Sequence, residues 1–132
     1  MVLLLPSVDF LIYSFIYLFK TMAEVFNRAS AELTTSFASI YAAPTSTGDV
    51  AVVLSALVAN VDGSAAADVD LCIYSGGSAL TGGKLASTIS VPADSSLELI
   101  PNKVVLKAGE SLYAKASAAS DLELTISVLE IT

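Results

Sequence analysis

From Glu32 onward, apolar residues recur at every second position, separated by short turns rich in glycine, proline and aspartate. Alternation with a period of two predicts strands with one buried and one exposed face. Turn residues fall roughly every 8 to 14 positions, which predicts about eight strands, the first beginning at Leu33. We therefore expect an all-β domain over residues 32–132, built as an antiparallel β-sandwich or a jelly-roll-like barrel.

The strand predicted over residues 50–61 is apolar on both faces. Strict alternation divides its side chains into two sets, one with Val50, Val52, Leu54, Ala56 and Val58, and the other with Ala51, Val53, Leu57 and Val61. A half-buried strand of a small domain needs only one apolar face. We therefore expect the second face to contact a neighbouring protein.

Two glycine pairs flank a predicted loop between residues 76 and 83. A phosphate-binding loop would lead from a strand into a helix, whereas Lys84 leads into another predicted strand, so a hairpin that contacts a partner is favoured. Together with the apolar strand, this loop supplies the candidate interface residues, which are Val50, Val52, Val53, Leu54, Leu57, Val58, Gly76, Gly77, Gly82 and Gly83.

Residues 1–21 form a separate apolar extension that holds five of the ten aromatic side chains. Three interpretations stay open: an export signal or membrane anchor, an apolar helical segment of the protein, and upstream sequence read in frame before a start at Met22. Pro6 and Asp9 weaken the membrane interpretation because they interrupt the apolar stretch. Residues 22–31 are expected to form a short helix or an arm ahead of the domain.

The composition excludes most catalytic chemistry. The chain has no histidine, no tryptophan and one cysteine, which rules out Ser/His or Cys/His nucleophiles, an intrachain disulfide and a thiolate zinc site. Thirteen acidic residues against six basic ones give a net charge of −7, which argues against nucleic-acid binding. We expect no cofactor and no bound metal.

A few side chains could still carry a site. Asp68 and Asp70 share one face of a predicted strand, with Asp62 in the preceding turn, and paired carboxylates can act as acid and base or bind calcium. A solvated outer face explains the same alternation. Cys72 has no neighbouring base, so we interpret it as a packing residue. The tyrosines after Met22 are expected to close the core: Tyr41, Tyr74 and Tyr113.

The order of turns and strands resembles that of small structural proteins of tailed bacteriophages. Four segments carry the resemblance: Leu33-Thr34-Thr35 through Tyr41-Ala42-Ala43-Pro44, the apolar strand from Val50 to Asn60, Leu106-Lys107-Ala108-Gly109-Glu110-Ser111-Leu112-Tyr113, and the end from Leu124 to Glu130-Ile131-Thr132. It covers residues 30–132 and involves no catalytic signature.

The resemblance implies a non-enzymatic virion component that binds the capsid or the tail, with capsid decoration favoured over a tail or fibre role. Its expected partners are capsid or tail proteins and its own copies, in a homo-oligomer such as a trimer. A membrane is expected as a partner only if residues 1–21 belong to the protein. The alternative is a secreted or surface-anchored bacterial adhesion module that uses residues 1–21 as its export signal. An enzyme that uses Asp68 and Asp70 is the least favoured interpretation.

Overall fold

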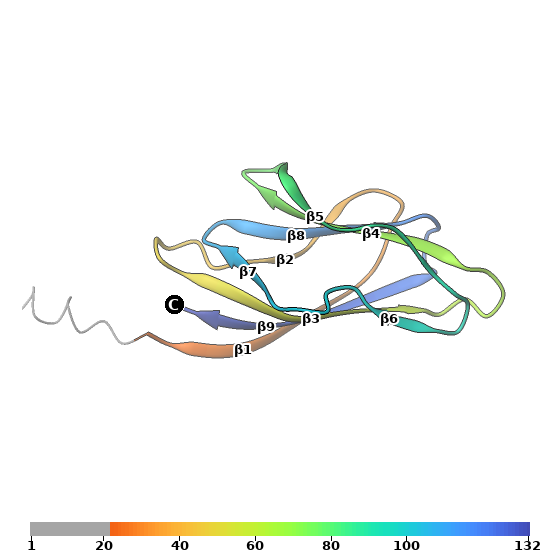
Figure 1. Cartoon of the computed structure of the whole chain (residues 1–132), viewed down its shortest axis with the longest axis horizontal. Coiled ribbons are helices and arrows are strands. Elements are labelled where there is room, and N and C mark those ends of the chain that lie inside the picture. Colours follow the sequence, from red (N-terminus) through yellow and green to blue (C-terminus); the bar gives the residue numbers. More distant parts are fainter. Residues whose placement is uncertain (1–21) are drawn as a thin grey trace, which may run out of the picture.

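A computed structural model describes residues 22–132, which fold into two antiparallel sheets packed face to face (Figure 1). The first sheet has the order β1-β9-β3-β6, and β7 also pairs with β3; the second has the order β2-β8-β4-β5. The strands are β1 Glu24–Glu32, β2 Ala38–Ala42, β3 Val50–Asn60, β4 Ala67–Ser75, β5 Ser78–Val91, β6 Ser96–Glu98, β7 Val104–Lys107, β8 Glu110–Ala116 and β9 Leu122–Ile131.

The all-β prediction is confirmed, because the described residues form nine strands and no helix. The predicted apolar extension over residues 1–21 lies outside the described residues. Between residues 22 and 132, no helix is long and apolar enough to cross a membrane.

The core lies between the two sheets, where alternate side chains of the long strands meet. From β9, Leu122, Leu124, Ile126 and Val128 are fully buried. They face residues of the second sheet such as Leu71 on β4 and Leu112 on β8, which are also fully buried. The core therefore follows the period-two pattern from which the fold was predicted.

The short helix predicted for residues 22–31 is wrong, since this segment forms β1. It pairs with β9 without a break from Glu24 opposite Ile131 to Glu32 opposite Glu123. An isolated helix of ten residues is only marginally stable, whereas the edge of β9 offers backbone partners along its whole length. Pairing with β9 therefore overrides local helix propensity.

The first predicted strand also begins too early. Leu33 is buried, but residues 33–37 carry the chain from the first sheet to the second, and β2 covers only Ala38–Ala42. The hydroxyl of Thr34 donates a hydrogen bond to the Ser36 carbonyl (3.0 Å), which satisfies this carbonyl within the crossing segment. Of the alternating residues Leu33, Thr35 and Phe37, only Leu33 is buried in the core, so the apolar pattern here does not mark a strand.

Candidate functional site on the outer face of the first sheet

The outer face of the first sheet carries a row of apolar side chains across four strands. Because Leu124, Ile126 and Val128 point inward from β9, Leu129 points outward. The pairing places Phe26 on β1 and Val52 on β3 opposite Leu129, and Val105 on β7 opposite Val52. Phe26 is 77% exposed and Val105 is 56% exposed. Within residues 22–132, Phe26 and Val105 are therefore largely uncovered, and Val52 and Leu129 are half-buried.

A β-bulge on β3 adds a fifth residue to this row. Val53 pairs with Val128 and Ser55 pairs with Ser127, so Leu54 is an extra residue on β3. Val53 and Ala56 are both fully buried, which leaves Leu54 and Ser55 on the outer side of the strand. We call Phe26, Leu54, Val52, Leu129 and Val105 the outer apolar patch.

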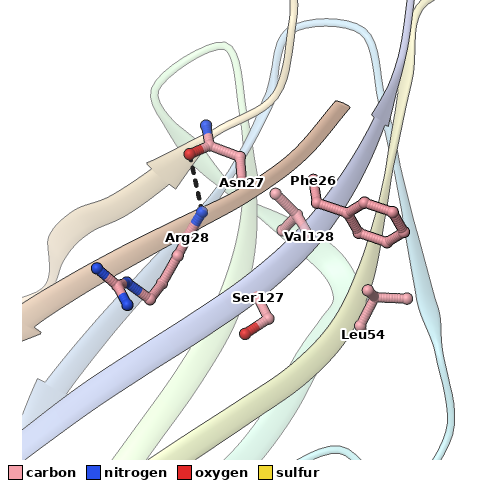
Figure 2. Close-up of a pocket in the computed structure, with 6 residues that line it drawn as sticks. All are labelled: Phe26, Asn27, Arg28, Leu54, Ser127 and Val128. Carbon is pink, nitrogen blue, oxygen red and sulfur yellow. Dashed lines mark hydrogen bonds between the residues drawn. The ribbon is translucent and has the colours of Figure 1, made fainter. Parts of the chain in front are cut away.

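A shallow hollow of about 470 Å³ lies within the patch and is lined by Phe26, Asn27, Arg28, Leu54, Ser127 and Val128. Figure 2 shows the Phe26 ring extending from β1 across β9 to lie beside Leu54 on β3, with Ser127 on β9 to one side of them. Its lining is mixed, since Phe26, Leu54 and Val128 are apolar whereas Asn27, Arg28 and Ser127 are polar or charged.

Charged side chains surround the patch in a definite order. The next row toward the chain termini holds Glu24 on β1, the apolar pair Ile131 and Val50, and Lys107 on β7. Glu24 and Lys107 are thus at opposite corners, and both are exposed. Within residues 22–132 the only ion pair joins Lys84 to Asp70, so neither corner residue has a charged partner in the described part of the chain.

Six of the candidate interface residues predicted from the sequence lie on β3, but not all on one face. Val50, Val52 and Leu54 are half-buried on the outer face, and Leu57 is 43% exposed. Val53 and Val58 have no exposed surface and belong to the core. The predicted division of β3 into two faces fails beyond Val53 because the bulge shifts the alternation, which places Ala56 and Val58 inside and Leu57 outside.

The four candidate glycines lie in the β4–β5 hairpin of the second sheet rather than around a free loop. Gly76 and Gly77 form the two-residue turn between Ser75 and Ser78, and both have positive φ, as a tight hairpin turn of this kind requires. Gly82 and Gly83 lie within β5, where the pairing with β4 is irregular. These glycines belong to a hairpin of the second sheet, whereas the outer apolar patch lies on the first sheet.

The candidate carboxylates stabilise local structure. The Asp70 carboxylate lies 3.1 Å from the Lys84 ammonium and accepts the Thr88 N–H at 3.1 Å. The Asp62 carboxylate accepts the N–H groups of Ser64 and Ala65 and so stabilises the turn after β3. In the part of the chain that the structure describes, no three His, Cys, Asp or Glu side chains are grouped as a metal site.

Two of the three tyrosines expected in the core lie instead on the outer face of the second sheet. Tyr74 and Tyr113 stack with ring centroids 3.8 Å apart, and Phe37 lies against Tyr74 at 6.0 Å. The Lys115 ammonium is 5.0 Å from the centre of the Phe37 ring. Cys72, opposite Tyr113 in the pairing, is buried as a packing residue. These aromatic side chains therefore cover one another on the part of the second sheet's outer face that β4 and β8 form.

Tyr41 is buried, as predicted, near the end of the sandwich where the sheets meet. Its hydroxyl donates a hydrogen bond to the Glu130 carboxylate at 2.8 Å, and the Asn27 amide donates to the same oxygen at 3.1 Å. Burial, this hydrogen bond and the negative charge of Glu130 raise the pKa of the Tyr41 hydroxyl above its ordinary value. The three side chains connect β1, β2 and β9.

Sequence reasoning missed three of the five patch residues. Phe26 was assigned to a helix, and Leu129 and Val105 are single apolar residues at outward positions of their strands. Their positions in the chain are far apart, and only the strand order β1-β9-β3-β7 brings them into one row. An apolar residue at the outward position of an alternating strand was the available signal.

No protein-family model matches this chain, and no curated protein matches it in sequence. Solved structures with a similar fold include a chain of the acid-stable capsid of Helicobacter pylori bacteriophage KHP30, with 10% identity, coverage of 85% of this chain and 94% of that chain, and a TM-score of 0.50. Another is a chain of the disulfide-linked pili of Bacillus endospore appendages, with 21% identity, 83% and 87% coverage, and a TM-score of 0.49. The similarity to the capsid chain supports the β-sandwich fold.

Proposed function

We propose that the protein is a non-enzymatic structural subunit of a phage particle, attached to the capsid, and that the outer face of its first sheet is a surface that binds protein during this assembly. The outer apolar patch is the observation that carries this proposal. A soluble domain of this size rarely exposes a continuous row of apolar side chains across four strands. Such a row usually marks a surface that binds another protein. The patch residues come from β1, β3, β7 and β9, so they form a continuous surface on a rigid sheet.

The chemistry of the candidate side chains supports binding rather than catalysis. Asp62 and Asp70 are held by turn and ion-pair contacts, and Cys72 is buried. The excess of negative charge keeps the remaining surface hydrated and opposes nucleic-acid binding. A fold shared with a phage capsid chain agrees with an attachment role on the capsid, which we favour over a tail or fibre role.

Mass spectrometry of particles tests this function. Phage particles from a host culture that carries the gene would be purified on a density gradient, and the protein quantified relative to the major capsid protein. We expect a fixed ratio to the major capsid protein in full particles and in tailless heads. Recovery only in the membrane or secreted fraction would contradict the proposal and favour the adhesion module.

Two matched variants link particle binding to the patch. Val105→Asp places a charge in the patch, whereas Val61→Asp places the same charge just beyond the far end of β3, at a valine of similar exposure, 52% against 56%. We expect the Val105 variant to be lost from purified particles and the Val61 variant to remain. Retention of both variants would show that another surface attaches the protein.

A further inference from the structure

We propose that a second copy of this chain covers the outer apolar patch, in a face-to-face dimer with two-fold symmetry. This inference rests on the proposed function. It names a second copy of the chain as the protein that binds the outer face of the first sheet. It also rests on two rows of side chains across the sheet, the apolar row of Phe26 and Val105 and the row of Glu24 and Lys107, each of which is complementary to itself. The two-fold axis would run parallel to the strands, between β9 and β3.

Rotation about this axis brings each strand opposite a defined strand of the partner. The four strands that carry the apolar row lie in the order β1, β9, β3, β7. A 180° rotation about this axis therefore places β1 opposite the partner's β7 and β9 opposite the partner's β3. Each row of side chains faces the same row of the partner, because the rotation does not change positions along the strands. Sheets packed in this way lie about 10 Å apart with their strands nearly aligned.

This arrangement pairs apolar with apolar residues in the central row. Phe26 faces Val105 of the partner subunit, and Leu129 faces Val52 of the partner subunit. Both pairs occur twice because the interface is isologous. The most exposed aromatic side chain of the described residues, Phe26, is then buried against an exposed valine. Large aromatic side chains that become buried in an interface commonly contribute strongly to binding.

The corner charges match in the same arrangement. Glu24 lies on β1 and Lys107 lies on β7, in one row beside the patch. Each would face its opposite charge across the interface: Glu24 faces the partner's Lys107, and Lys107 faces the partner's Glu24. If this face bound only a capsid surface, Glu24 and Lys107 would not need to lie at matching corners.

The bulge completes the fit. Leu54 projects from β3 and so faces Ser127 on β9 of the partner subunit, which lines the hollow together with Phe26. Each copy therefore supplies one leucine and one hollow, and Figure 2 shows both on the same face. Five outward rows on β1, β9 and β3 and two on β7 give about 550 Å² per copy, hence about 1,100 Å² in total, close to the lower limit for a specific interface. We therefore expect a weak dimer.

Sedimentation equilibrium of the purified protein, with charge reversal, tests the arrangement. We expect a monomer–dimer equilibrium for the unaltered protein. Glu24→Lys alone and Lys107→Glu alone should each raise the dimer dissociation constant about five-fold at low salt, because each change creates two like-charge contacts. The double variant with both changes should return to within about two-fold of the unaltered protein, since its corner charges again match.

Val105→Asp should raise the dissociation constant at least about ten-fold, and the matched Val61→Asp should leave it unchanged. A strict monomer at about 100 µM, a three-fold assembly, or a double variant no better than its single parents would overturn the dimer. This experiment uses purified protein and the particle measurement uses virions. The dimer and the capsid role can therefore fail separately.

Discussion

The outer faces of the two sheets differ in how their exposed aromatic side chains are covered. On the second sheet, Phe37 comes from the preceding segment and lies against the stacked pair Tyr74 and Tyr113, with the Lys115 ammonium over its ring. On the first sheet, Phe26 is 77% exposed and nothing in residues 22–132 covers it. Within residues 22–132, the second sheet covers its aromatic side chains with one another, whereas the first sheet leaves Phe26 exposed.

The difference teaches that an exposed aromatic side chain must be judged by its neighbours. Phe37 and Phe26 are both located outside the core between the sheets, near the start of the domain. Phe37 contributes to folding stability because its contacts are intramolecular. Phe26 has no comparable cover within residues 22–132, so under the proposed dimer its contribution is to association. Three measurements sharpen this comparison.

The largest expected effect comes from truncation of the two phenylalanines. Phe37→Ala removes ring packing and a cation–π contact, so the free energy of unfolding should fall by about 2 kcal/mol. Phe26→Ala should change it by less than about 0.5 kcal/mol, measured by urea denaturation at a protein concentration that favours monomer. Equal losses for the two variants would show that the faces do not differ as described.

A smaller effect is expected at Asp70, under the aromatic cluster. Asp70→Asn removes the charge that binds Lys84 and weakens the bond from the Thr88 N–H, which should lower the free energy of unfolding by about 1.5 kcal/mol. Asp68→Asn on the same strand is the control, with an expected change below about 0.5 kcal/mol. A larger loss in the free energy of unfolding for Asp68→Asn than for Asp70→Asn would contradict the stabilising role given to Asp70.

The smallest effect concerns Tyr41, at the end where the two sheets meet. The folded state raises the pKa of this phenol, so above pH 10 the hydroxyl ionises in the unfolded chain before it ionises in the native one. Stability from this group is present below pH 10 and is lost as the pH rises further. Tyr41→Phe should therefore lose less stability between pH 8 and 11, by a few tenths of a kcal/mol after solvent screening. Identical pH profiles in urea denaturation would contradict this.

The alternating pattern predicts most of the strands correctly, because burial on one face of a sheet acts on every second residue. Two features escaped it. Residues 24–32 can alternate or follow a helical period equally well, and only the free edge of β9 decides between them. The bulge at Leu54 changes no residue type, so the exchange of faces beyond Val53 has no sign in the sequence.

The candidate site was harder to predict than the fold. Val50, Val52, Leu54 and Leu57 were found because β3 is apolar on both faces. Phe26, Leu129 and Val105 were missed because a row across four strands depends on strand order and register, which arise from tertiary structure. Single apolar residues at outward strand positions carry little information until their neighbours are known.

The bulge on β3 determines which deletions the domain can tolerate during evolution. Leu54 is one residue more than β9 requires, and Val53 and Ala56 already point into the core on either side of the extra position. Loss of one codon at this point would keep every inward side chain in its place and remove the leucine that, in the proposed dimer, faces the hollow of the partner subunit. Mutation can therefore alter what this protein associates with while the domain itself continues to fold.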